Sequence, residues 1–178
     1  MQRHPDIDIL ASERIHQGHV FDVLRETVRL PSGLRQLVDV VEHAGAVCIA
    51  AVTDEGELLL VRQYRHPVGD WIVEIPAGRL ERGDDDPLAA AQRELEEETG
   101  HRAATWERAC TFFPAPGFCS ELHTLFVARG LEPVPGGGLA ADDDEEIEVV
   151  RAAPAELFAG ATRDAKTLIA AAWLLLGR

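Results

Sequence analysis

The chain has 178 residues, of which 46% are hydrophobic, with 15 glycines and 10 prolines. This length and composition predict one globular domain with a full-sized core. The formal net charge of −14 argues against a nucleic-acid-binding surface, which would need a basic stripe. No apolar run approaches the roughly 20 residues that a membrane span requires, and residues 1–18 lack the apolar core of a signal peptide. The three cysteines include no Cys-x-x-Cys pair, so we expect neither a disulfide framework nor a zinc site, and a cytoplasmic location.

The first part of the chain is predicted to consist mainly of strands. Pro31-Ser32-Gly33 is a turn signal between two strand-like segments, which together resemble a β-hairpin. Asp54-Glu55-Gly56 is a second turn signal between two further strands. A short strand then leads into a loop at Gly78. The predicted strands are residues 20–30, 34–43, 46–52, 57–65 and 71–76.

An acidic helix is predicted to follow, starting at Pro87. Asp86 can accept hydrogen bonds from first-turn amides, and proline at the first helical position gives up an N–H that would have no helical partner. Gly100 supplies the stop signal. Residues at helical spacing form the stripe that we expect to be buried. They are Leu88, Ala91 and Leu95.

Beyond this helix, the pattern predicts further strands and two helices. The strands are residues 104–113, 121–131 and 147–153, and the helices are residues 154–160 and 165–178. The last helix is strongly apolar and is expected to be buried. The segment 132–146 is rich in Pro, Gly and acids, and loops of this length are often functional. We therefore expect an α+β or α/β sandwich in which the acidic helix packs on a mixed sheet.

The acids of the helix are spaced to act together. Glu94 and Glu98 are four residues apart and Glu97 lies three beyond Glu94, so these carboxylates share one face, whereas Glu96 points away. Like charges at this spacing each destabilise a helix by a few tenths of a kcal/mol. A divalent cation would reverse that effect, and clustered carboxylate oxygens are ligands that Mg²⁺ or Mn²⁺ prefers. The alternative is a solvated acidic helix.

The segment from Gly78 to His101 resembles the Nudix box. Its second half is present as "RELEEETGH", with His101 in place of the usual aliphatic residue. In the first half one residue is inserted, and the Glu position is occupied by Asp84 or Asp85. Five fixed residues at fixed spacing make this a specific motif. The resemblance implies the Nudix fold, an α/β/α sandwich with a mixed β-sheet, a catalytic loop-helix-loop and an N-terminal β-hairpin extension.

The resemblance covers most of the chain and extends to one branch of the Nudix hydrolases. "LLLVRQYRHPVGDWIVEIPAG", "VVEHAGAV" and "APGFCSE" look like the branch that cleaves ADP-ribose and related nucleoside diphosphate sugars. That branch carries a proline about sixteen residues beyond the box glycine, where Pro116 stands relative to Gly100. The predicted N-terminal hairpin suggests a homodimer with exchanged strands. Residues 1–43 would be the dimerisation extension and residues 44–178 the hydrolase domain.

The same likeness assigns roles to individual residues. The metal ions, two or three of Mg²⁺ or Mn²⁺, would be held by Glu94, Glu97, Glu98 and the carbonyl of Ala77, with Glu97 also counted as catalytic. Arg65 would hold a substrate phosphate, although without the family likeness it would read as an exposed arginine at a strand end. The likeness further implies substrate-binding roles for Asp39, Gly78, Pro116 and Gly117. Asp39 would keep an acidic role where relatives often carry Arg-Glu and this chain has Val38-Asp39.

The expected reaction is metal-dependent hydrolysis of a pyrophosphate bond. In the likeness a carboxylate from the loop before the last strand removes the proton of the attacking water. Glu145 is the leading candidate for this base and for a further metal ligand, with Asp143 and Glu146 as alternatives. ADP-ribose would give AMP and ribose 5-phosphate. The alternatives are another nucleotide sugar, a nucleoside triphosphate, or a non-catalytic domain that binds a nucleotide sugar and regulates a partner.

Overall fold

The computed structural model of the chain describes residues 4–80, 86–136 and 146–177. The chain forms two units, one containing residues 1–45 and 113–122, and the other residues 46–112 and 123–178. The division into domains at residues 43 and 44, and the part of the first of them in dimerisation, stay predictions.

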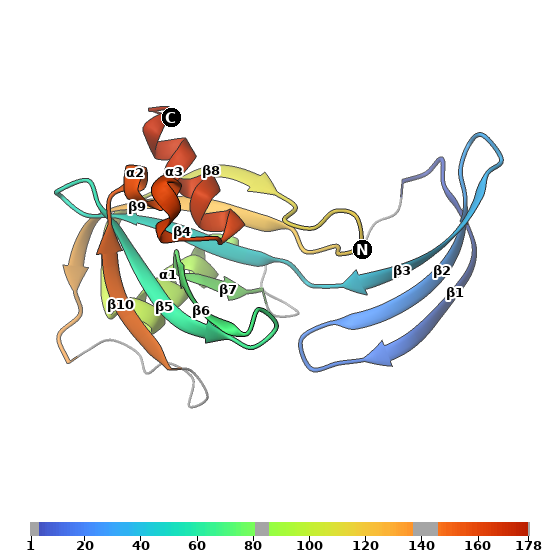
Figure 1. The fold of residues 1–178 in the computed structure, drawn as a ribbon, viewed down its shortest axis with the longest axis horizontal. Coiled ribbons are helices and arrows are strands. Elements are labelled where there is room, and N and C mark those ends of the chain that lie inside the picture. Colours follow the sequence, from blue (N-terminus) through green and yellow to red (C-terminus); the bar gives the residue numbers. More distant parts are fainter. Residues whose placement is uncertain (1–3, 81–85, 137–145, 178) are drawn as a thin grey trace. The chain divides into compact units, whose positions relative to one another are not determined.

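The larger unit is built on a mixed seven-stranded sheet (Figure 1). Five strands follow the order β10-β5-β4-β9-β8, while β6 pairs with β5 and β7 pairs with β4. β4 and β9 are parallel, and the other neighbours are antiparallel. The strands are β4 Ala46–Val52, β5 Leu58–Arg65, β6 Asp70–Glu74, β7 Ala77–Arg79, β8 His101–Phe112, β9 His123–Pro133 and β10 Ile147–Ala152. The strands predicted in this unit are therefore present, and β7 is an addition.

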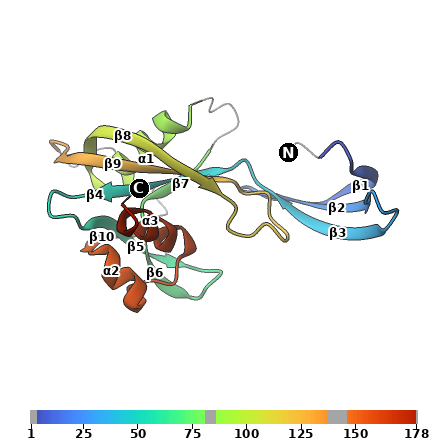
Figure 2. The ribbon, with the colours of Figure 1, turned by 90° about the horizontal axis from the view of Figure 1, so that it is seen from above.

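Both faces of this sheet are covered by a helix (Figure 2). Because successive side chains of a strand point to opposite faces, the fully apolar β4 contributes to two cores. Cys48 and Ala50 pack in the core that contains residues of α3 (Ala165–Leu175). Val47 and Ile49 pack in the other, which contains residues of α1 (Pro87–Thr99). These layers position α1 against a rigid sheet.

The helix α1 begins and ends as its sequence predicts. Asp86 is the N-cap and its side chain accepts from the backbone N–H of Leu88. Gly100 adopts the left-handed conformation with φ 67° and donates its N–H to the carbonyl of Glu96. The side chains of Ala91 and Leu95 are fully buried, and Leu88 is partly buried against the same core.

The C-terminal helices are present, but the last one is not buried throughout. α2 (Pro154–Glu156) continues into a π-helical turn, η1 (Leu157–Ala161), before α3 begins after its N-cap Asp164. Leu175 and Leu176 are 56% and 74% exposed. The expectation of a buried helix is therefore wrong for its end, because only one side of α3 faces the sheet. Among the described residues, no helix is both long enough and apolar enough to cross a membrane.

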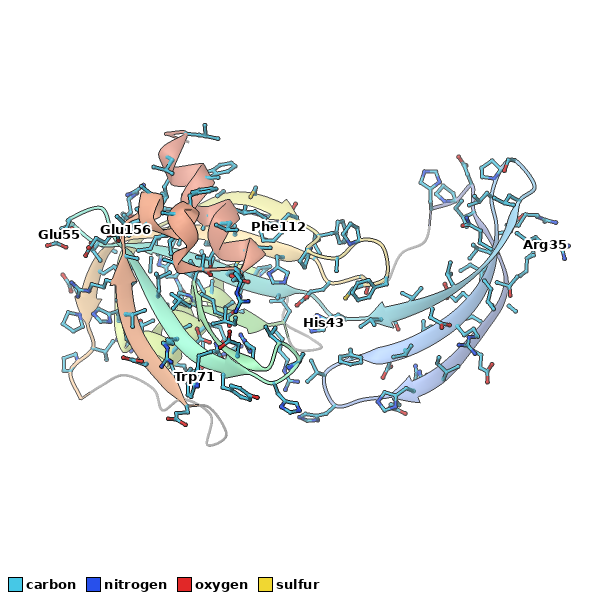
Figure 3. The ribbon with its side chains drawn as sticks, in the orientation of Figure 1. Arg35, His43, Glu55, Trp71, Phe112 and Glu156 are labelled. Atoms are coloured by element: carbon cyan, nitrogen blue, oxygen red, sulfur yellow. The ribbon has the colours of Figure 1, made fainter. Side chains whose placement is uncertain are left out.

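The smaller unit contains a three-stranded antiparallel sheet in the order β1-β2-β3. β2 (Asp22–Arg29) and β3 (Arg35–Glu42) form the predicted hairpin. β1 (Asp8–Gln17) was not predicted, and all ten of its residues are exposed. Figure 3 shows the side chains of this sheet, between Arg35 at the start of β3 and His43 just beyond its end.

Candidate active site

The acidic face of α1 lies against the segment Ala77–Gly78. β7 holds this segment in place by pairing Ala77 with Cys48 and Gly78 with Val47. The backbone N–H of Ala77 donates to Oε2 of Glu98 over 3.0 Å. A Cβ on Gly78 would lie only 1.9 Å from Cδ of Glu94, so this carboxylate occupies the space that any other residue would fill. Four of the predicted site residues therefore meet at one place.

Glu97 belongs to the same face and is the more accessible acid. Its side chain is 29% exposed, compared with 16% for Glu94. Arg93 lies between them, with Nη2 at 3.1 Å from Oε1 of Glu94 and Nε at 3.7 Å from Oε2 of Glu97. Arg93 thus lowers the repulsion between the carboxylates, which carry like charge at helical spacing.

Glu96 points away from this cluster, as predicted. It accepts from Nε and Nη2 of Arg102 over 2.6 and 2.9 Å. This contact raises the pKa of the Arg102 guanidinium. Glu96, Arg102 and Trp106 line a hollow of about 330 Å³ between α1 and β8. Its lining includes none of the residues to which the sequence assigned a catalytic or binding role.

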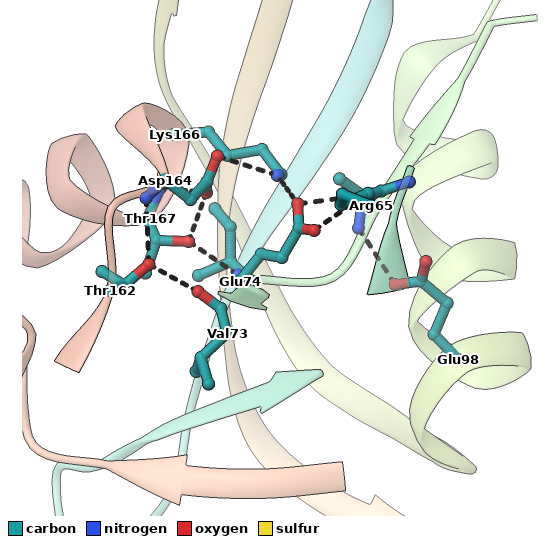
Figure 4. Close-up of polar contacts among 10 residues, drawn as sticks. Arg65, Val73, Glu74, Glu98, Thr162, Asp164, Lys166 and Thr167 are labelled. Atoms are coloured by element: carbon teal, nitrogen blue, oxygen red, sulfur yellow. Dashed lines mark hydrogen bonds and ion pairs between the residues drawn. The ribbon is translucent and has the colours of Figure 1, made fainter. Parts of the chain in front are cut away.

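Arg65, the predicted phosphate ligand, lies at the end of β5 and contacts the neighbouring strand. Its Nε and Nη2 bind the two carboxylate oxygens of Glu74 over 2.6 and 3.3 Å. Figure 4 shows the contact between Arg65 and Glu74. The side chain of Arg65 remains 40% exposed, whereas that of Glu74 is 3% exposed. Arg65 is therefore held by Glu74 in a two-pronged contact and remains partly accessible.

Glu74 has a second cationic partner that the sequence analysis did not identify. Lys166, the second residue of α3, forms an ion pair with Glu74, and both residues are buried. Nζ of Lys166 also lies 3.1 Å from Oδ1 of Asp164 (Figure 4). The available signal was a charged residue inside each of two apolar segments, "WIVEIP" and "AKTLIAAAWLLL". Charged residues are seldom fully buried unless they are paired.

Three of the predicted substrate-binding residues lie in the smaller unit. Asp39 on β3 accepts from Nε and Nη2 of Arg25 over 2.7 and 2.9 Å. That hydrogen bonding holds the pKa of the Asp39 carboxyl below its ordinary value of 3.8. Pro116 and Gly117 are exposed in a turn closed by the N–H of Cys119, which donates to the carbonyl of Ala115 over 2.9 Å.

The remaining predictions fall partly outside the described residues. Glu145 and Asp143, the leading and one alternative candidate for the base, lie there, as do Asp84 and Asp85 of the box. Glu146 is described and exposed, one residue before β10. Within the described ranges, no group of three His, Cys, Asp or Glu side chains has the geometry to hold a metal ion by itself. The metal-ligand, base and substrate-binding assignments all stay predictions.

Comparison with known proteins identifies the family. The model of the NUDIX domain matches residues 42–171. An ADP-ribose pyrophosphatase of Bacillus subtilis is 43% identical over 141 residues, covering 79% of this chain and 75% of the relative. A methanol dehydrogenase activator of Bacillus methanolicus is 37% identical over 171 residues, covering 94% and 91%.

A solved structure described as an ADP compounds hydrolase superposes with a TM-score of 0.82. The match covers 99% of this chain and 96% of that one at 22% identity, so it bears on the fold alone. It confirms the predicted fold, a mixed β-sheet with few helices and an N-terminal hairpin. On the match to residues 42–171, the chain belongs to the Nudix family.

Proposed function

We propose that this chain is a metal-dependent hydrolase of the pyrophosphate bond in ADP-ribose or a related nucleoside diphosphate sugar. ADP-ribose would give AMP and ribose 5-phosphate. The name of the Bacillus subtilis relative supports this substrate class. The observation that carries the proposal is the contact of Glu94 and Glu98 with Gly78 and Ala77, which brings the acids of the box to one loop.

The residues at this place fit Mg²⁺ or Mn²⁺. The carboxylates of Glu94, Glu97 and Glu98 and the carbonyl of Ala77 are hard oxygen donors, which these ions prefer. The absent Cβ of Gly78 leaves the Glu94 carboxylate room beside the backbone. These four groups would hold two or three ions. Bound there, the ions would neutralise phosphate oxygens and lower the pKa of the attacking water.

The chain's own residues would orient the substrate and move the proton. Arg65 would bind a phosphate of the diphosphate with its planar cation, while Glu74 fixes the plane of the guanidinium. Glu145 would take the proton of the attacking water, because a carboxylate that is not fully committed to metal is the better base. Asp39, Gly78, Pro116 and Gly117 would contribute to the remaining substrate contacts.

We further propose that the protein acts as a homodimer in the cytoplasm. The smaller unit supports self-association because it leaves large apolar side chains exposed on a thin sheet, and such surfaces often mark an interface. Ile9, Leu10, Ile15, Leu34 and Leu37 are each at least 40% exposed. Cytoplasmic location rests on cysteine usage in the sequence.

A substrate screen tests the proposed function directly. Purified protein is incubated with ADP-ribose, other ADP- and GDP-sugars, dinucleotides and nucleoside triphosphates, each with Mg²⁺ or Mn²⁺. We expect ADP-ribose to be the best or nearly the best substrate, with measurable turnover of at least one other diphosphate sugar and little turnover of triphosphates. Selective hydrolysis of a triphosphate would overturn the substrate class. Saturable binding of a nucleotide sugar without turnover would favour the non-catalytic alternative.

A further inference from the structure

The ion pair between Glu74 and Lys166 places two opposite charges in the interior of the larger unit. Glu74 is 3% exposed and Lys166 is 8% exposed. Removing charges from water is costly, and a well-packed apolar pair of the same size often stabilises a fold as well or better. Stability alone therefore does not explain why this ion pair is present.

Hydrogen bonds that do not involve Lys166 also hold the start of α3 against the segment at the end of β6. The backbone N–H of Ile75 donates to Oγ1 of Thr167 over 2.8 Å, and Oγ1 of Thr162 donates to the carbonyl of Val73 over 2.5 Å. Asp164 caps α3 by accepting from the backbone N–H of Thr167 over 2.9 Å. Lys166 is not a partner in any of these three hydrogen bonds, although its Nζ also lies 3.1 Å from Oδ1 of the capping Asp164.

The position of Glu74 links Lys166 to the candidate site. The carboxylate accepts from Arg65 on one side and from Lys166 on the other (Figure 4). When two cations share one buried carboxylate, they repel each other, and this repulsion offsets part of the attraction that each feels for the carboxylate. Lys166 therefore weakens the hold of Glu74 on Arg65 while leaving the two-pronged contact in place.

We propose that Lys166 is a positioning residue for Arg65, acting through Glu74. Because Lys166 neutralises part of the charge of Glu74, the guanidinium attracts a substrate phosphate more strongly while its contact with Glu74 stays in place. The inference rests on the proposed role of Arg65 in the hydrolase. It does not require Lys166 to contact the substrate.

The kinetic test removes the charge of Lys166 while keeping the bulk of its side chain. Lys166→Met should raise the KM for ADP-ribose roughly tenfold and change kcat less than about threefold, since a charge-assisted phosphate contact is weakened. Lys166→Arg should restore most of the affinity. Lys166→Gln is the second variant should the methionine variant fail to fold. A KM within twofold of the wild type in either charge-removing variant that folds would overturn the proposal.

Arg163→Met is the matched control. Arg163 pairs with Asp70 over 2.5 Å and so joins the approach to α3 with the start of β6, but its side chain is 72% exposed and does not contact Glu74. This variant should leave KM and kcat unchanged. An equal rise of KM in Arg163→Met would overturn the proposal by showing that loosening of the segment, and not the charge on Glu74, is responsible.

A double variant separates positioning from a structural role. In the Lys166→Met background, Glu74→Gln removes the unshared negative charge that holds Arg65 but keeps an amide oxygen that can still accept from the guanidinium. Positioning predicts that the KM of the double variant falls back at least threefold towards the wild type. A structural role predicts the opposite, because two buried partners would then be lost, and an unchanged or higher KM would overturn the proposal.

A measurement without turnover keeps this inference distinct from the proposed function. The Nε–H signal of Arg65, assigned with Arg65→Lys, is followed by NMR in the metal-free protein. Lys166→Met should shift this signal and slow its exchange with solvent, because Glu74 then holds Arg65 more tightly. An unchanged signal would overturn the role of Lys166 even in an active enzyme. Absence of turnover in the wild type would instead overturn the proposed function, leaving the NMR result to decide on Lys166.

Discussion

The two sheets of this protein differ in both the composition and the burial of their strands. In the larger unit, β4 is buried along its whole length and contributes to a core on each face. In the smaller unit, β1 is exposed along its whole length, and its contacts include a surface ion pair between Asp8 and Arg29. The first sheet has two covering helices, while in the described part of the second no helix is present.

This difference indicates a division of tasks. Precise placement of carboxylates needs a rigid support, and α1 lies on the sheet whose interior is packed. A three-stranded sheet with exposed apolar side chains gains stability when another surface covers it. We therefore expect substitutions in the larger unit to affect chemistry and folding, and those in the smaller unit to affect association.

The largest effect is expected from Glu97→Gln in the larger unit. Loss of this carboxylate should lower turnover of ADP-ribose about 100-fold or more at saturating Mg²⁺, since a ligand of the catalytic ion is removed. The fold should be intact, or slightly more stable without metal, because one of several repelling charges is neutralised. Steady-state kinetics and thermal unfolding measure both. Near-normal rates would refute the metal assignment.

The sequence was most informative where the signals are local. The bounds of α1 follow from Asp86, Pro87 and Gly100, which act within one turn of each helix end. β1 was missed because its residues, "DILASERIHQ", mix charged and apolar types, and only pairing with β2 makes them a strand. The three residues of β7 are likewise a strand only through β4.

The candidate site shows the same division between local and distant signals. The face shared by Glu94, Glu97 and Glu98 could be predicted because helical spacing determines it. The contact of Glu74 with Lys166 could not, since the two residues lie on elements far apart in the sequence and meet only when α3 packs against β6. The family likeness assigned Glu94 and the carbonyl of Ala77 to one metal site, but it did not predict that the Glu94 carboxylate lies beside Gly78.

A pair of identical substitutions compares the stability of the two sheets. Leu59 is 1% exposed in the larger unit and Leu37 is 68% exposed in the smaller one. Leu59→Ala should lower the free energy of unfolding by about 2 to 5 kcal/mol, because it leaves a cavity in the core. Leu37→Ala should change it by less than about 0.5 kcal/mol in dilute protein. Urea unfolding measures both values, and equal losses would contradict the comparison.

A charged substitution tests whether the apolar surface of the smaller unit forms a dimer interface. Leu37→Lys should shift the mass measured by light scattering from a dimer towards a monomer, because a buried unpaired lysine would oppose the interface. Leu176→Lys on the larger unit is the control. Leu176 is 74% exposed, so this variant should leave the mass unchanged. A wild-type protein that is monomeric at micromolar concentration would remove the basis for the dimer.

The smallest effect is expected from the ion pair of Asp39 with Arg25. The folded-state pKa of Asp39 lies below its ordinary value, so the ionised pair stabilises the fold above the unfolded-state pKa. That contribution is lost as the pH falls through the folded-state pKa, which places the change below about pH 4. Asp39→Asn should therefore unfold slightly earlier than the wild type at pH 6, and the difference should vanish in acid. A difference that persists in acid would assign the effect to packing.

The parallel pairing of β4 with β9 has a consequence for the order of folding. Ala46 pairs with His123 and Val52 with Arg129, so every rung of this ladder joins positions separated by several intervening elements. Contacts of such high sequence separation close large loops and form slowly. A chain emerging from the ribosome therefore carries the apolar segment "AVCIAAV" without its parallel neighbour until β9 has been synthesised. During that interval β4 is an apolar strand without its parallel neighbour, and exposed segments of this kind favour aggregation.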